Sequence, residues 1–372
     1  MGTHQLIYIR TDGNKNIASG HLTRCLSVAL ACRQLGLDVQ FLVSDKESLF
    51  LLQSIWSEWK SMADAPAAPT EFTVLQLQTA SYNQLEQELP EVTSCLSSHT
   101  SDTPVFFLDS YYVTESYLSA LKPFAKIAYL DDLRLFDYPV DLLINYDVIP
   151  DLELASYKAS YKNAGQLLLG AAYTPLRSQF QGKHAPIKNQ VKNILITTGG
   201  TDPCHFCLAF IRRLEHFNFS DFFAFPDIIF HIVIGKLNTD KDILCEYAAR
   251  LPFLQLHENV TDMASLMLCC DLAISAAGTT LYELCALGIP SVSFTMADNQ
   301  LPSARTFASA GAVPCAGDLR GNPVMVLDNV FQFIKDFSAK SSYTKRKSAQ
   351  KTMCGLIDGS GALRIAKALK KL

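Results

Sequence analysis

The chain has 372 residues, 49% of them hydrophobic, and a formal net charge of -4 at pH 7. These values are typical of a globular protein and exclude a disordered or fibrous chain. Lysine and arginine residues are scattered along the chain, which argues against nucleic acid as a partner. A chain of this length usually forms two domains.

The first half of the chain alternates between strand patterns and helix patterns. Helical spacing of apolar residues is found at 22–36, 82–97 and 115–123, and the first of these helices is expected to end at Gly36. Short apolar runs predict strands at 6–10, 38–44, 72–77, 104–110, 126–132 and 141–146. This alternation predicts a parallel sheet with crossover helices, and therefore a first Rossmann-like domain over residues 1–175.

The alternation repeats in the second half. A polar stretch at 178–190 predicts a linker, and strand patterns resume at 191–203 and continue to residue 317. We expect a second Rossmann-like domain over 188–350, and a segment over 351–372 whose amphipathic helix packs back on the first domain. Two doubly wound α/β domains facing across a cleft would bind a ligand at the carboxyl ends of their strands.

Several features bear on location and on metals. The first residues lack the regions of a signal peptide, and no apolar run has the length of a transmembrane helix. The 11 cysteines are dispersed, many of them in apolar runs, which favours a reducing cytoplasm. Cys204 and Cys207 flank His205, but no second ligand pair stands at a matching distance. We therefore expect a helix start with one buried thiol there, and neither a metal nor a cofactor.

The stretch IASGHLTRC, residues 17–25, places a histidine on the first turn of a predicted helix. Ala18, Ser19 and Gly20 lead to His21 and leave room for a ligand beside it. A histidine side chain can take up a proton near neutral pH, which makes His21 a candidate general base. The alternative is a polar residue that bonds its own helical turn.

A second candidate site lies at 271–300. A strand ends at Ser275, small residues including Ala277 and Gly278 turn tightly, and Thr279 opens a helix. Free amides at a helix start attract phosphate oxygens, so this turn predicts a diphosphate site that needs no metal. Glu283, one turn further, can accept hydrogen bonds from both hydroxyls of a ribose, or it only stabilises the helix.

Two glycines, Gly199 and Gly200, follow the first strand of the second domain. Turns need glycine for ordinary reasons, so the pair is weak evidence alone. At the end of that strand, however, the pair would face the same cleft. We interpret these glycines as room for the diphosphate or the sugar, with Asp202 and Pro203 preparing a helix start.

Stretches along nearly the whole chain resemble, in the same order, the UDP-sugar hydrolases of the pseudaminic acid pathway, which belong to the glycosyltransferase-B (GT-B) superfamily. The family cleaves UDP from UDP-2,4-diacetamido-2,4,6-trideoxy-β-L-altropyranose. The similar stretches include TDGNKNIASGHLTRCLSVA, ILITTGGTDP, the segment 262–300 and IDGSGALRI. Shorter ones are LDSYY, LDDL, LLINYD and LLLGAAYTPLRSQF.

This resemblance implies roles for individual residues. It makes His21 the catalytic residue, with Gly20 clearing space for the sugar. It places Asp12 and Tyr111 near the sugar, and Asn299 and Gln300 near the sugar and the phosphates. It also implies that the backbone of Val260 lies near uracil. The remaining substrate-binding residues contact UDP: Ala277, Gly278, Thr279 and Glu283. Ala18 and Ala277 stand where the family usually has glycine, which could narrow the pocket.

The resemblance implies hydrolysis with inversion, in which a water held by His21 attacks the anomeric carbon and the helix amides stabilise the departing diphosphate. The expected partners are a UDP-sugar and UDP, and the chain is expected to be a monomer or a weak homo-oligomer.

An inverting glycosyltransferase is the alternative enzyme. It would hold an acceptor on the first domain, and a membrane-bound acceptor would require an apolar, basic patch there. The segment 48–60, with Trp56 and Trp59, is more simply a core helix. A non-catalytic nucleotide-sugar-binding protein is a third alternative, which the presence of His21 disfavours.

Overall fold

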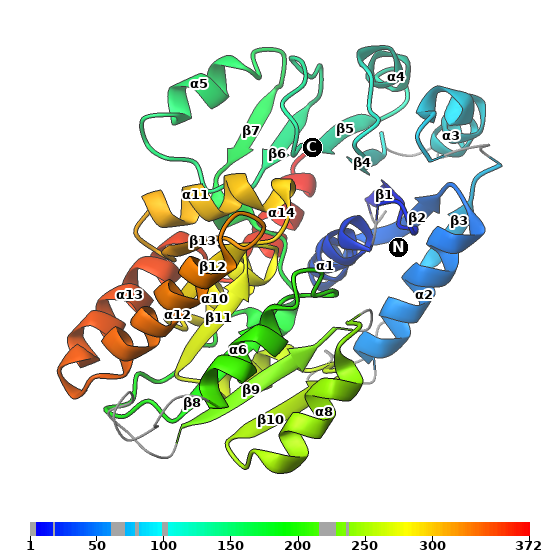
Figure 1. The fold of residues 1–372 in the computed structure, drawn as a ribbon. Coiled ribbons are helices and arrows are strands. Elements are labelled where there is room, and N and C mark those ends of the chain that lie inside the picture. Colours follow the sequence, from blue (N-terminus) through cyan, green and yellow to red (C-terminus); the bar gives the residue numbers. More distant parts are fainter. Residues whose placement is uncertain are drawn as a thin grey trace. The chain divides into compact units, whose positions relative to one another are not determined.

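The computed structural model describes residues 5–17, 19–60, 71–78, 82–98, 103–215, 228–235 and 238–372 (Figure 1). The chain divides into two compact units. The first unit comprises Met1–Ser178 and Gly359–Leu372, and the second comprises Gln179–Asp358. Each unit is built on its own parallel β-sheet.

The first unit has a seven-stranded sheet with the order β3-β2-β1-β4-β5-β6-β7. All of its strand pairs are parallel. The strands are apolar nearly throughout because helices cover both faces of the sheet. They span Leu6–Thr11 (β1), Asp38–Val43 (β2), Thr73–Gln76 (β3), Val105–Asp109 (β4), Lys126–Leu130 (β5), Leu142–Asn145 (β6) and Gln166–Leu169 (β7).

Helices cover the two faces of this sheet as two separate hydrophobic clusters. One cluster joins the sheet to α1 (Gly20–Gln34), α2 (Lys46–Lys60) and α14 (Gly361–Leu369). The other joins it to α3 (Leu89–Ser97), α4 (Glu115–Leu121) and α5 (Leu154–Ala159). Short 3-10 turns lie at Leu85–Glu88 (η1), Ala171–Tyr173 (η2) and Ser178–Phe180 (η3). The expected core helix at 48–60 is confirmed, because Trp56 of α2 is buried in the first cluster.

The predicted helix at 82–97 begins later than expected. Residues 85–88 form η1, and α3 starts only at Leu89. Pro90 is the reason, because proline lacks a backbone N–H and is tolerated only in the first turn of an α-helix.

The second unit has a six-stranded parallel sheet with the order β10-β9-β8-β11-β12-β13. Its strands span Asn193–Thr197 (β8), Ile229–Ile234 (β9), Leu254–Glu258 (β10), Leu272–Ala276 (β11), Ser291–Thr295 (β12) and Cys315–Asp318 (β13). Its helices are α6 (Phe206–Glu215), α8 (Lys241–Arg250), α9 (Met263–Cys269), α10 (Thr280–Leu287), η4 (Asp298–Gln300), α11 (Leu301–Ser309), α12 (Pro323–Ser338), η5 (Lys340–Ser342) and α13 (Tyr343–Leu356).

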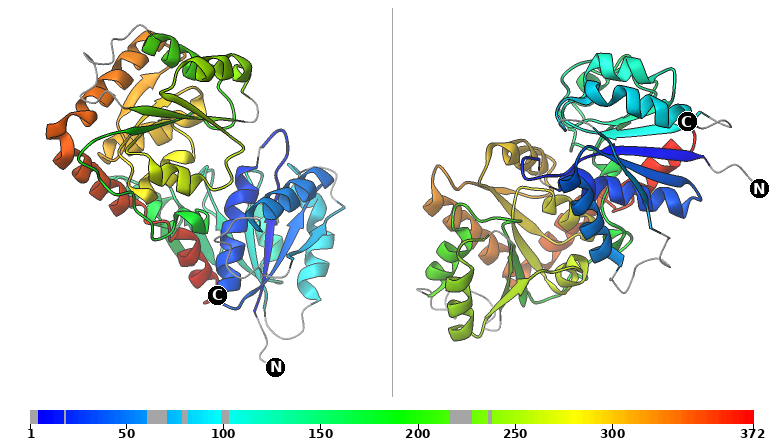
Figure 2. Two further views of the ribbon diagram at one scale, coloured as in Figure 1. Left: turned by 90° about the horizontal axis from the view of Figure 1, so that it is seen from below. Right: turned by 90° about the vertical axis from the view of Figure 1, so that its right-hand side faces the viewer.

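The C-terminal helix α14 belongs to the first unit, where it lies beside α1 (Figures 1 and 2). Ile365 and Leu369 are fully buried in that cluster. The approach is close at Gly361, where an added Cβ would lie 2.1 Å from the carbonyl oxygen of Thr174. Only glycine therefore fits at the start of α14.

The predicted boundary at residue 351 needs correction. Residues up to Leu356 continue α13, and residues up to Asp358 belong to the second unit. The helix is held there because Met353 is fully buried and Gln350 Nε2 donates to the carbonyl of Gly288 at 3.2 Å. The chain returns to the first unit only at Gly359, which has a φ of +76°.

The prediction of a linker over 178–190 is wrong for the part after residue 184. The Ala185 N–H donates to the carbonyl of Leu287 at 2.8 Å, and the Ala185 carbonyl accepts from Gln350 at 2.6 Å. Arg346 donates to the carbonyls of Lys188 at 2.9 Å and Asn189 at 3.1 Å. Polar composition suggested a linker, but the backbone of this segment is bonded into the second unit.

A buried ion cluster lies beneath the carboxyl end of β1. Arg10 is fully buried and donates to Glu88 through Nε at 2.8 Å and Nη2 at 2.7 Å. Its Nη1 donates to Asp12 at 2.6 Å, and the Tyr117 hydroxyl donates to Glu88 at 2.6 Å. Burial, followed by the charge of Glu88, raises the pKa of Tyr117 well above its usual value, so this hydroxyl keeps its proton.

Replacing Glu88 by glutamine is expected to lower the free energy of unfolding by about 3 kcal/mol, because Arg10 then loses one of its two buried counter-charges. Chemical denaturation would measure it. The matched control is Glu115→Gln at an exposed position of α4, expected to change stability by about 0.5 kcal/mol or less. Equal effects of the two variants would contradict a structural role for the cluster.

Candidate functional site

Several of the sequence-predicted residues follow the strands at which the strand order of each sheet reverses. In the first sheet the order reverses between β1 and β4, and in the second between β8 and β11. Ligands of doubly wound sheets bind outside the carboxyl ends of the strands at such a point. His21 follows β1 and Tyr111 follows β4, whereas Gly200 follows β8 and Gly278 follows β11.

His21 lies on the first turn of α1 and faces the end of β4. Its side chain is only 4% exposed, and its Nδ1 lies 2.6 Å from Oδ1 of Asp109. Arg24, one turn further along α1, grips the same carboxylate with Nη2 at 2.5 Å and Nε at 2.6 Å. The shorter contact of His21 is therefore to Asp109 on β4, while Nη2 of Arg24, on its own helix, lies 3.0 Å from the same Nδ1.

The charge of Asp109 determines which nitrogen of His21 carries the proton. Burial alone would raise the pKa of Asp109, but Arg24 and His21 outweigh burial and lower that pKa below its usual value. The carboxylate is therefore ionised and can only accept hydrogen bonds. Nη2 of Arg24 also lies 3.0 Å from Nδ1 of His21, but the ionised Asp109 is closer, at 2.6 Å, and needs a donor. We therefore assign the proton of the neutral ring to Nδ1, in the bond to Asp109. Nε2 of the neutral ring then remains a proton acceptor, as a general base requires.

Arg24 connects this pair to two further strand ends. Its Nη1 donates to Oδ2 of Asp132, after β5, at 2.7 Å, and to the hydroxyl of Tyr146, after β6, at 2.6 Å. The ring of Tyr111 meets His21 edge-on, with centroids 4.4 Å apart, and Tyr111 is 40% exposed. The carboxyl ends of three neighbouring strands thus surround the start of α1.

Sequence reasoning missed four residues of this network: Arg24, Asp109, Asp132 and Tyr146. Each of the last three stands in a quoted stretch, LDSYY, LDDL or LLINYD, where an apolar strand ends in polar residues. That shared pattern is the signal that could have found them.

The residues around His21 differ in accessibility. A Cβ added at Gly20 would meet no heavy atom within 4 Å, whereas Ala18 lies outside the described residues. Asp12 is buried, and both of its oxygens accept hydrogen bonds, from Arg10 at 2.6 Å and from the Ser44 N–H at 2.7 Å. Asp12 therefore orders the end of β1, and its role in a sugar pocket stays a prediction.

In the second unit, the turn between β11 and α10 has the expected tight form. The Gly278 N–H donates to the Ala276 carbonyl at 2.8 Å, and Ala277 is buried with its N–H bonded to Phe294. Thr279 is the N-cap of α10, and its side chain does not cap the helix. Glu283 lies on the first turn of the helix and is half-buried. This helix start has the geometry that phosphate groups favour, although phosphate binding here stays a prediction.

The neighbouring turn after β8 packs against the end of β9. Gly199 has a φ of +84°, and a Cβ added at Gly235 would lie 2.4 Å from the carbonyl oxygens of both Gly199 and Gly200. Asp202 caps α6 by accepting from the N–H groups of Phe206 and Cys207, both at 2.9 Å. Cys207 is fully buried, so the expected helix start with a buried thiol is confirmed.

The other predicted ligands lie on neighbouring loops of the second unit. Val260 precedes α9 and is half-buried, and Asn299 is exposed on η4. Gln300 accepts from the Met296 N–H at 2.8 Å through Oε1. Their contacts to a ligand stay predictions.

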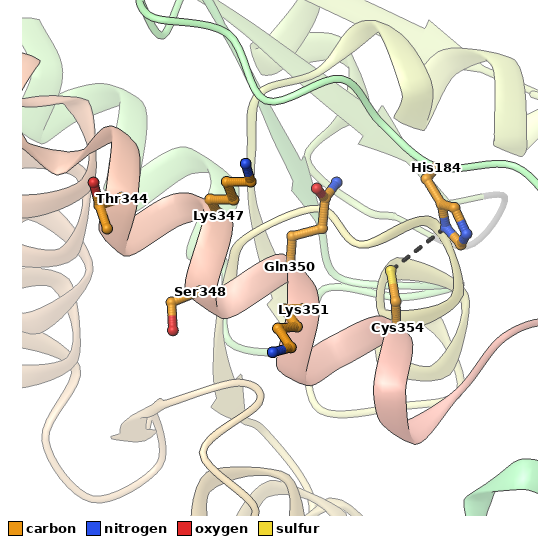
Figure 3. A pocket seen from close by; sticks show the side chains of 7 residues that line it. All are labelled: His184, Thr344, Lys347, Ser348, Gln350, Lys351 and Cys354. Atoms are coloured by element: carbon orange, nitrogen blue, oxygen red, sulfur yellow. Dashed lines mark hydrogen bonds between the residues drawn. The ribbon is translucent and has the colours of Figure 1, made fainter.

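A groove of about 540 Å³ runs along α13 in the second unit (Figure 3). Lys347 and Gln350 are on its helical wall, and Cys354 Sγ lies 3.5 Å from Nδ1 of His184. None of the sequence-predicted site residues lines it. The groove is therefore separate from the candidate site.

No helix in the described ranges has the length and apolarity to cross a membrane. Those same ranges contain no group of three or more His, Cys, Asp or Glu residues placed to hold a metal ion.

Two Rossmann-like units with these parallel sheets define the GT-B fold, and comparison with solved structures agrees. The chain superposes on MurG of Acinetobacter baumannii with a TM-score of 0.66 at 14% identity, covering 99% of this chain and 100% of that chain. For a UDP-GlcNAc 2-epimerase from Neisseria meningitidis bound to UDP-GlcNAc, the TM-score is 0.59 at 13% identity, covering 100% of both chains. At such low identity the likeness shows the fold alone.

Sequence comparison gives nearer relatives. The chain is 29% identical to the spore coat polysaccharide biosynthesis protein SpsG of Bacillus subtilis over 217 residues, which is 57% of this chain and 58% of that protein. It is 31% identical over 150 residues to the pseudaminic acid cytidylyltransferase and UDP-2,4-diacetamido-2,4,6-trideoxy-beta-L-altropyranose hydrolase of Helicobacter pylori, covering 39% of this chain and 25% of that protein. The chain thus spans less than two thirds of these curated relatives. No protein-family model matches it.

Proposed function

We propose that the protein hydrolyses the bond between UDP and an amino-deoxy sugar, the UDP-linked 2,4-diacetamido-2,4,6-trideoxy sugar of pseudaminic acid biosynthesis. The observation that carries the proposal is the bond of 2.6 Å between His21 Nδ1 and Asp109, which leaves Nε2 as a base. The similarity to the Helicobacter pylori protein supports the choice of substrate.

In the proposed reaction, Nε2 of His21 takes a proton from a water molecule as the water oxygen bonds to the anomeric carbon. The bond between that carbon and the diphosphate oxygen breaks, and UDP leaves with the bonding electrons. Direct displacement inverts the anomeric carbon. Asp109 stabilises the imidazolium that forms, because the carboxylate already accepts its Nδ1 proton.

The second unit would bind UDP. The amides at the start of α10, after Gly278, stabilise negative charge on the leaving diphosphate. Glu283 accepts from the ribose hydroxyls, the backbone of Val260 lies near uracil, and Asn299 and Gln300 contact the sugar and phosphates. No metal or cofactor enters the proposal. We further propose that the protein acts in the cytoplasm as a monomer or weak homo-oligomer.

Incubation of the pure protein with a panel of UDP-2,4-diacetamido sugars, with and without a chelator, tests this function. UDP release that is independent of the chelator is the expected result. No release from any member of the panel, or release that is abolished by the chelator, would contradict it. Binding of UDP without release would instead favour a non-catalytic binding protein.

An inverting glycosyltransferase is the alternative enzyme, because the same base could take its proton from an acceptor hydroxyl. The loop after β5 exposes Leu133 and Leu135, which are 43% and 65% exposed, with Arg134 between them. Such a surface is what a transferase with an apolar acceptor would offer. Release of UDP that needs an added acceptor would favour it over hydrolysis.

A further inference from the structure

The groups packed around His21 carry an excess of negative charge. Arg24 and Cys25 come from α1, Asp109 and Tyr111 from the end of β4, Asp132 from the segment after β5, and Tyr146 from the segment after β6. Burial is the main cause that raises the pKa of both Cys25 and Tyr111, so both are neutral. Two carboxylates and one guanidinium leave one excess negative charge beside the imidazole.

Asp132 is not needed to neutralise Arg24. Asp109 already does so with both oxygens, through contacts of 2.5 and 2.6 Å. Burial raises the pKa of Asp132 above its usual value, Arg24 lowers it, and Asp109 adds to the rise. A second carboxylate in this place therefore costs stability, and its side chain is only 21% exposed. Because the ionised Asp132 lowers the stability of the fold, we look for a functional role for this carboxylate.

We propose that Asp132 is a positioning residue that sets the proton affinity of His21 by adding a second negative charge beside Arg24. The inference rests on the proposed role of His21 as the base. Without Asp132, the positive charge of Arg24 would cancel that of Asp109, and protonation of His21 would leave an uncompensated cation. With Asp132, the charges of the two carboxylates, Arg24 and the imidazolium sum to zero when Nε2 takes the proton from water. Asp132 acts through Arg24, whose Nη1 it contacts at 2.7 Å.

The test compares Asp132→Asn with Tyr146→Phe. Asp132→Asn removes a charge but keeps an oxygen that can accept from Nη1 of Arg24 at the place of the 2.7 Å bond, whereas Tyr146→Phe removes the neutral acceptor at 2.6 Å and no charge. The His21 titration is followed in the free protein by NMR of histidine labelled with nitrogen-15, and its signal is assigned by loss in His21→Ala. For Asp132→Asn the titration midpoint should fall by about 1 pH unit. For Tyr146→Phe it should move by about 0.2 unit or less.

The pH profile of kcat provides a second measurement. Because the base must be unprotonated, the acid limb of Asp132→Asn should move to lower pH by the same amount. Asp132→Glu should restore the parent midpoint, and Asp132→Ser replaces Asp132→Asn if the asparagine variant does not fold.

The inference would be overturned if the His21 titration midpoint is unchanged in Asp132→Asn and Asp132→Ser. Equal shifts of that midpoint in Asp132→Asn and Tyr146→Phe would overturn it as well. A shifted NMR midpoint in a protein that releases no UDP would sink the proposed function and leave the role of Asp132 intact. UDP release with unshifted midpoints would do the reverse.

Discussion

Replacing His21 by alanine is expected to lower kcat for UDP-sugar hydrolysis by about 10²–10⁴-fold, the usual contribution of a general base. The affinity for UDP should stay near that of the parent, because the proposed UDP ligands lie in the second unit. UDP release and calorimetric UDP binding would measure the two effects separately.

The matched control for this variant is His184→Ala. His184 is a histidine of the second unit that contacts Cys354 and lines the α13 groove. Its kcat should stay within about two-fold of the parent value, since it has no place in the proposed chemistry. Hydrolysis at the parent rate by His21→Ala would contradict the role of His21 as the general base.

Asp109→Asn has the second large expected effect, a loss of about 10²–10⁴-fold in kcat, because the amide no longer fixes the proton on Nδ1 or stabilises the imidazolium. Nitrogen-15 shifts of His21 should show loss of the single tautomer with the proton on Nδ1. An unchanged tautomer and an unchanged kcat would contradict the role of Asp109.

The same variant makes a prediction about stability and pH. The pKa of Asp109 is lowered in the folded protein by Arg24 and His21 against the effect of burial. The ionised Asp109 therefore contributes its full stabilisation above the pKa of an ordinary carboxyl group, about pH 4. This stabilisation is lost as the pH falls from that value toward the lower pKa of Asp109 in the folded protein. Denaturation series should show that the parent loses more stability than Asp109→Asn over that acid range. Parallel losses would contradict this assignment.

Local patterns predicted most of the strands that build the fold. The runs at 6–10 and 104–110 are apolar because both faces of their strands are covered. A continuous apolar run is therefore enough to predict a buried strand. Gln166–Leu169, the edge strand β7, was missed because it has only four residues and is defined by its pairing with β6. The docked segment after residue 184 was missed for a similar reason, since its partners lie on α10 and α13.

The candidate site shows the same division between local and distant information. Small residues beside His21 make it a candidate site residue from its own stretch alone. Its partner Asp109 lies 88 positions away, and Arg24 and Asp132 lie 108 positions apart, so no local pattern could join them. An arginine on an amphipathic helix also suggests a solvated side chain, whereas Arg24 points into a buried network.

Hydrolysis in water enriched in oxygen-18 tests the central claim most directly, which is that water attacks the anomeric carbon and not the diphosphate. Mass spectrometry of both products would locate the label after one turnover. The account predicts oxygen-18 in the released sugar and none in UDP. Label in the terminal phosphate of UDP would show attack on phosphorus and would contradict the account.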